Sequence, residues 1–184
     1  MPLTIFPRLG NSVSSRSPDA PKNTFITLTY SEENLPNNGS VDIRDFQAFM
    51  KKLRSHLDYN GQGKIKYFHC GEYGDLLSRP HYHAIIFGWE PCDKSLWKTV
   101  NGEEYYLSET LDNLWGLGHT VVGAVTLESA MYVARYITKK ITGEDSYQHY
   151  QGVDRKSGEI VPVNSEYASM SNGIGTSWFE KYHT

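Results

Sequence analysis

The spacing of apolar and polar residues changes several times along the chain, and each change predicts a different element. Residues 24–30 mix β-branched and aromatic residues, which is typical of a strand. After a turn at 36–39, apolar residues recur every three or four positions over 43–57, which predicts an amphipathic helix that begins after Asp42. The same patterns predict further strands at 64–72, 81–87 and 119–126, a short helix at 108–115 and a longer helix at 128–140.

The remaining segments show no sustained period. Residues 1–22 are rich in proline and serine and predict a flexible N-terminal arm, so that one domain covers 23–184. Residues 89–104 are expected to form an irregular insertion, and a hairpin is expected around 155–158. The order of the elements predicts the α+β class: a ferredoxin-like or RRM-like antiparallel sheet of four to five strands, with helices packed on one face.

Composition and charge restrict the classes of function. With 39% hydrophobic and 21% charged residues the chain is that of a folded domain, and its two cysteines, Cys70 and Cys92, have no zinc-site spacing. It contains no apolar run of about 18 residues and no signal-peptide order, so we expect a cytoplasmic protein without membrane contact. Because the formal net charge is -3, a nucleic-acid partner must be argued from local sites.

The first candidate site contains two histidines in one strand. His81 and His83 are two residues apart, so their side chains project from the same face of the sheet. Glu72 ends the neighbouring strand, and two imidazoles with one carboxylate favour an open, catalytic metal site. His69 competes as a ligand, but its parity differs from that of Glu72, which we prefer because its hard oxygen suits Mg²⁺ or Mn²⁺. The alternative is one packed and one solvated histidine.

The second candidate site contains two tyrosines on the predicted helix 128–140. Tyr132 and Tyr136 are four residues apart, so they share one helix face and both hydroxyls can reach one site. The same helix carries three basic residues, Arg135, Lys139 and Lys140, against the single acidic residue Glu128. The alternatives are an aromatic pair buried against the sheet and a solvated basic helix end.

Together these motifs resemble a known family. The run 79–88 looks like the His-hydrophobic-His motif of HUH endonucleases, and 132–140 is similar to the paired-tyrosine motif of rolling-circle replication initiators. Residues 25–30 resemble the first strand motif of the same initiators, and the three motifs occur in the family's order. The likeness is closest to the replication initiators of microviruses, in particular the gokushovirus group, and runs from about Thr24 to the C-terminus.

The resemblance implies a fold and a reaction. It implies an HUH endonuclease domain over 23–184 that nicks and rejoins single-stranded DNA through a 5′-phosphotyrosine, starting and ending rolling-circle replication of a small circular genome. Mg²⁺ or Mn²⁺ would be held by His81, His83 and Glu72, and Tyr132 or Tyr136 would attack the phosphate. The basic residues Arg135, Lys139 and Lys140 would bind DNA phosphates, and the two lysines would also neutralise the oxyanion.

The resemblance also implies partners. These are single-stranded DNA at a replication origin and the polymerase and helicase of a bacterial host. The protein would act as a monomer in the cytoplasm of that host. Two other functions remain open from the residues: a transposase or relaxase that uses one tyrosine on the same platform, and a non-catalytic module that binds single-stranded DNA. A hydrolase that releases a free 5′-phosphate fits less well, because nothing in the sequence marks a general base.

Overall fold

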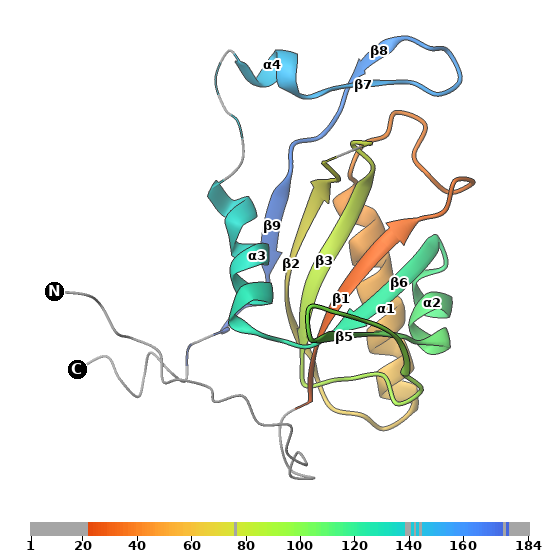
Figure 1. The fold of residues 1–184 in the computed structure, drawn as a ribbon, viewed down its shortest axis with the longest axis vertical. Coiled ribbons are helices and arrows are strands. Elements are labelled where there is room, and N and C mark those ends of the chain that lie inside the picture. The colour runs from red at the N-terminus through yellow and green to blue at the C-terminus, as the bar shows by residue number, and fades with distance from the viewer. Residues whose placement is uncertain are drawn as a thin grey trace, which may run out of the picture.

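The computed structural model describes residues 22–75, 77–138, 141, 143, 145–174 and 176. Among these, seven strands form one sheet in the order β4-β5-β6-β1-β3-β2-β9, in which all neighbours are antiparallel (Figure 1). The sheet strands are β1 Asn23–Tyr30, β2 Lys66–Tyr73, β3 Pro80–Phe87, β4 Ser95–Val100, β5 Glu103–Leu107, β6 Gly118–Gly123 and β9 Tyr167–Met170. The helices are α1 Ile43–Tyr59, α2 Glu109–Trp115, α3 Leu127–Thr138 and α4 Asp145–His149, and a separate ribbon pairs β7 Gln151–Val153 with β8 Ile160–Pro162.

The α+β class and the antiparallel sheet are confirmed, but the sheet is wider than predicted. The segment 89–104, expected to be irregular, contributes β4 and the start of β5, and β9 adds a strand at the opposite edge. Every residue of β4 is exposed, so this strand lacks the inside-outside alternation that marks a half-buried strand. The hairpin expected around 155–158 is present as the β7–β8 ribbon.

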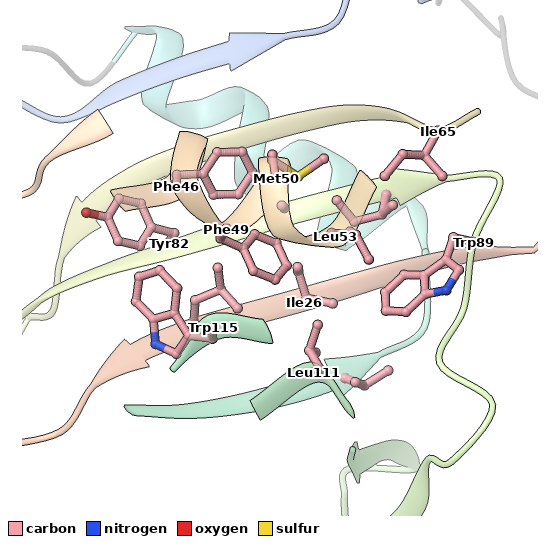
Figure 2. Packing of buried hydrophobic residues seen from close by; sticks show 14 of the residues in the cluster. Ile26, Phe46, Phe49, Met50, Leu53, Ile65, Tyr82, Trp89, Leu111 and Trp115 are labelled. Atoms are coloured by element: carbon pink, nitrogen blue, oxygen red, sulfur yellow. The ribbon is translucent and has the colours of Figure 1, made fainter. Parts of the chain in front are cut away.

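The main core lies between the sheet and α1. Asp42 caps α1, since its Oδ1 accepts a hydrogen bond from the backbone N–H of Arg44 over 2.9 Å. The apolar face of α1 then packs against β1 and β3 and against α2 (Figure 2). Its buried residues are Phe46, Phe49, Met50, Leu53 and Leu57.

The helices do not all pack on one face, which departs from the prediction. Tyr82 of β3 belongs to the core under α1, whereas Cys70 of β2 packs with Val133 of α3 on the other side of the sheet. Because successive strand residues point to opposite faces, both faces of β2 and β3 carry residues that need a cover. The sheet therefore has a second, smaller core under α3, and the candidate metal ligands lie on that side.

Several sequence-based expectations fall outside the described residues. Residues 1–21 of the expected arm and both lysines, Lys139 and Lys140, are among them. Within the described part of the chain, no helix has the length and apolar character needed to cross a membrane.

Candidate metal centre and tyrosine nucleophile

Strand pairing brings the three predicted metal ligands together. Glu72 of β2 is the register partner of His81 of β3, and His83 lies two residues further along β3 on the same face. One ligand atom from each of the three lies within 4.8 Å of the others. Among the described residues, this group of histidine and carboxylate side chains could hold a metal ion.

One oxygen of the Glu72 carboxylate lies close to both histidine side chains. Glu72 Oε1 lies 2.9 Å from His81 Nε2 and 2.8 Å from His83 Nε2. Glu72 is 1% exposed, so its ionised form must be stabilised by these neighbouring side chains and not by water. A cation among these atoms would be coordinated by two imidazole nitrogens and one oxygen, and further coordination positions would stay open for a substrate.

The outer nitrogen of each imidazole also has a partner. His81 Nδ1 lies 3.0 Å from the backbone carbonyl of Arg79, and His83 Nδ1 lies 3.0 Å from Thr27 Oγ1. A carbonyl only accepts hydrogen bonds, so His81 Nδ1 carries the proton and its Nε2 is left as the ligand atom. A metal-binding histidine usually has such a partner on its other ring nitrogen, which fixes the orientation of the ring.

The charges of the group follow from burial and contact. Burial would raise the pKa of Glu72, but its close contacts with His81, His83 and Tyr132 outweigh burial and lower this pKa to about 2. Burial would lower the pKa of His81, but its contacts with Glu72 and the Arg79 carbonyl raise it. Burial lowers the pKa of His83. A charged carboxylate therefore lies beside a histidine that burial favours in its neutral, metal-binding form.

The buried nitrogen His83 Nε2 lacks a hydrogen-bond partner within the protein and is suited to bind a metal ion. His83 Nε2 is inaccessible to solvent and makes no hydrogen bond of acceptable angle, although Glu72 Oε1 lies 2.8 Å away. A buried imidazole nitrogen without a well-directed partner costs free energy. A cation would use its lone pair, so the residues present fit a divalent ion.

His69 lies on the face of the sheet opposite that of Glu72, as its position in the strand predicts. Its side chain points to the α1 face, where the ring stacks on Phe46 with centroids 3.6 Å apart. Burial lowers the pKa of His69 to about 3, so it is a neutral core residue. It does not take part in the group of Glu72, His81 and His83.

Among the tyrosine side chains that the structure describes, that of Tyr132 reaches this group. Its hydroxyl donates to Glu72 Oε1 over 2.5 Å, and its ring meets the ring of His83 edge-on with centroids 4.8 Å apart. Val133, the next residue, is fully buried beside Cys70 and fixes α3 on the sheet. Burial and then Glu72 raise the pKa of Tyr132, so its hydroxyl stays protonated in this arrangement.

The other predicted residues of this helix are described only in part. Tyr136 lies in α3 one turn after Tyr132, but its side chain is outside the described residues, as are Lys139 and Lys140. Arg135 is exposed, and its guanidinium carbon lies 5.8 Å from the centre of the Tyr132 ring. Of the predicted basic residues, Arg135 is thus placed beside the candidate nucleophile.

Sequence reasoning missed the residues that support the ligands. Thr27 and Phe25 come from β1, and the Phe25 ring stacks on His83 with an interplanar angle of 9°. Alternation in 24–30 indicates that Phe25 and Thr27 share a face, but only the pairing of β1 with β3 places them beside His83.

Comparison with known proteins identifies a family whose model matches this sequence. The family model described as Replication-associated protein ORF2/G2P matches residues 23–141. This range contains all four side chains whose contacts define the site: Glu72, His81, His83 and Tyr132.

Curated relatives match most of this chain. Replication-associated protein VP4 of Bdellovibrio phage phiMH2K is 39% identical over 167 residues, which are 88% of this chain and 49% of the relative. Replication-associated protein ORF4 of Chlamydia phage 1 is 37% identical, with 88% of this chain and 39% of the relative covered. Replication-associated protein ORF2 of Spiroplasma virus 4 is 37% identical, with 85% and 47% covered. The chain thus spans about half the length of these relatives or less, and no solved structure matches it significantly.

Proposed function

This chain belongs to the family of replication-associated proteins ORF2/G2P, and on that premise we propose that it nicks and rejoins single-stranded DNA to start and end rolling-circle replication. The observation that carries the proposal is the position of Tyr132. Its hydroxyl lies 2.5 Å from the same Glu72 oxygen that faces both histidines. A nucleophile and a set of metal ligands therefore meet at one point.

Each residue has a distinct role in this reaction. His81, His83 and Glu72 would hold Mg²⁺ or Mn²⁺, and a bound ion supplies a Lewis acid that withdraws charge from the scissile phosphate. The Arg79 carbonyl and Thr27 fix the orientation of the two imidazoles. Tyr132 supplies the attacking oxygen, and Arg135 lies close enough to its ring to contact a DNA phosphate next to it.

The cleavage step is a transesterification that needs no water. The phenolic oxygen of Tyr132 forms a bond to phosphorus, and the bond from phosphorus to the 3′ oxygen breaks. The tyrosine loses its proton and the leaving 3′ oxygen gains one, so the step balances. The products are a 5′-phosphotyrosine and a free 3′-OH that a host polymerase can extend.

A second tyrosine allows the circle to be closed. Tyr136 lies four residues after Tyr132, an axial rise of about 6 Å. While one tyrosine holds the 5′ end, the other cleaves the regenerated junction, and the released 3′-OH attacks the first phosphotyrosine. Lys139 and Lys140 would hold the DNA backbone and neutralise the oxyanion. A monomer could complete this cycle in the cytoplasm of the bacterial host, with a host helicase separating the strands.

The direct test is formation of a covalent adduct. The full chain is incubated with Mn²⁺ and circular single-stranded phage DNA, and the protein is examined for a DNA adduct that resists denaturation. We expect an adduct with the wild-type protein and none with the Tyr132→Phe, Tyr136→Phe double variant. Tyr59→Phe is the matched control, because Tyr59 is 92% exposed at the end of α1 and should retain the adduct.

Two results would replace this proposal by another function. Binding without any adduct, unchanged by a chelator, would favour a non-catalytic single-strand-binding module. Free 5′-phosphate ends without protein attached would favour a hydrolase.

A further inference from the structure

A polar cavity lies at the end of β2 and β3, beyond the candidate metal centre. It has a volume of about 440 Å³, within the range of about 300–1,000 Å³ of small-molecule sites. Its walls come from the β2–β3 turn, the loop before α1, and the segment that contains the β7–β8 ribbon. Figure 1 shows that ribbon and α4 above this end of the sheet.

Two arginines from different walls meet at one exposed carboxylate. Arg79 of the β2–β3 turn places Nη1 2.5 Å from Glu32 Oε2, and Arg155 of the ribbon pairs with Glu32 Oε1 and also donates to the Glu32 carbonyl over 3.1 Å. Two positive charges thus face one negative charge, and the Glu32 side chain is 65% exposed. Guanidinium forks match phosphate geometry, so a phosphate can take the place of this carboxylate.

The interior of the cavity offers a different chemistry. Glu166 is 7% exposed and accepts a hydrogen bond from the hydroxyl of Tyr150 over 2.7 Å. Tyr73 lines the same space, and its hydroxyl is fixed by the Asn164 carbonyl at 2.6 Å. A carboxylate accepts from the amino group of cytosine and cannot pair with thymine O4, and tyrosine rings can stack on a base.

One backbone group, the Arg79 carbonyl, links a wall of the cavity to the candidate metal centre. The Arg79 carbonyl accepts from the Gly74 N–H and from His81 Nδ1, each over 3.0 Å. The turn that forms one cavity wall is therefore the same turn that orients a proposed metal ligand. A DNA strand with its scissile phosphate at His81 can reach the cavity with a neighbouring nucleotide.

We propose that this cavity binds one nucleotide next to the cleaved phosphate of the single-stranded DNA, with its phosphate on Arg79 and Arg155 and its amine-bearing base against Glu166. This inference rests on the proposed function for the identity of the ligand. It adds a recognition pocket that would select the cleavage position by its base.

The test is DNA binding by the full chain in a chelating buffer, so that cleavage does not contribute. Fluorescence anisotropy is measured with labelled oligodeoxycytidylate and oligothymidylate over a range of salt concentrations. Arg155→Gln should weaken binding of both and reduce the log-log salt slope by about 0.7, the value for one lost phosphate contact on a single strand. Arg54→Gln on α1 removes the same charge outside the cavity lining and should leave the slope unchanged.

Two further variants separate recognition from structural support. Glu32→Gln removes the ion pair that Arg155→Gln also removes, together with the Arg79–Glu32 pair. It leaves both arginines free to bind phosphate, so it should strengthen binding where Arg155→Gln weakens it. A purely structural role would move both variants in the same direction. Glu166→Gln should remove the preference for oligodeoxycytidylate over oligothymidylate.

The outcomes distinguish this inference from the proposed function. If the wild-type protein forms the covalent adduct but the Arg155 and Glu32 variants bind like wild type or shift together, the cavity proposal is wrong and the nicking activity stands. If the opposite shifts appear but no adduct ever forms, the cavity proposal stands and the nicking activity is wrong. A wild-type protein that binds neither oligonucleotide overturns the cavity proposal.

Discussion

The hydroxyl of Tyr132 on α3 donates a hydrogen bond over 2.5 Å to Glu72 Oε1 on β2. The proposed nucleophile thus contacts a proposed metal ligand directly. The bond helps to keep Glu72 ionised, and it holds the tyrosine hydroxyl at the position where a scissile phosphate would be bound.

Loss of this hydrogen bond should be measurable without DNA. Tyr132→Phe leaves the buried Glu72 charge with one donor fewer, which we expect to lower the free energy of unfolding by about 1–2 kcal/mol in a chelating buffer. Urea denaturation measures the change. Tyr59→Phe removes an exposed hydroxyl and should leave the midpoint unchanged, and equal midpoints for the two variants would show that the bond contributes nothing.

Metal binding should stabilise the folded protein through His81 and His83. An ion that binds only the native state at about 100 times its Kd adds about 2.7 kcal/mol, so Mn²⁺ should raise the thermal midpoint. The His81→Ala, His83→Ala double variant should lose this shift. His119→Ala should keep it, because His119 is exposed on β6, outside the ligand group. An undiminished shift in the double variant would place the ion elsewhere.

The hydroxyl of Thr27 should tune metal affinity without touching the ion. Thr27→Val keeps the shape of the side chain but removes the partner of His83 Nδ1. Loss of a contact that orients a ligand in this way weakens metal affinity by about 10–100-fold. Calorimetric titration with Mn²⁺ measures it, with Thr99→Val on the exposed strand β4 as the control. Equal affinities would rule out a supporting role for Thr27.

The two tyrosines should be partly interchangeable. Tyr132→Phe and Tyr136→Phe should each retain some covalent adduct but lose the release of closed circles, because joining needs one tyrosine to hold the 5′ end while the other cuts. Gel separation of adducts and circles distinguishes the two activities. If one single variant lost all adduct and the other behaved as wild type, a single-tyrosine transposase or relaxase mechanism would be the better account.

A glycine in β2 should be needed for the edge strand β9. A Cβ at Gly71 would lie 2.6 Å from the ring of Tyr167, the register partner of Gly71 on β9. Gly71→Ala should therefore destabilise the protein by about 1–3 kcal/mol, as overpacking does. Gly63→Ala is the matched control, since nothing lies within 4 Å of a Cβ there. Chemical denaturation of both variants tests the contact.

The sequence alone determined the features that depend on local backbone geometry, namely the face of a strand or helix on which a side chain lies. A strand sends alternate side chains to opposite faces, so the spacing of His81 and His83 put both on one face, and the parity of His69 put it on the other. The helix period likewise predicted the buried face of α1 and the shared face of Tyr132 and Tyr136. These periods follow from backbone dihedral angles and need no knowledge of distant residues.

Only the tertiary structure decided which of these faces meet. The register that sets Glu72 opposite His81, and the placement of α3 on the second face of the sheet so that Tyr132 reaches Glu72, depend on contacts between residues far apart in the chain. The exposed strand β4 escaped prediction because an exposed strand has no buried face to leave a pattern in the sequence. Local periods fix the direction of a side chain, but its partner is fixed by long-range packing and strand pairing.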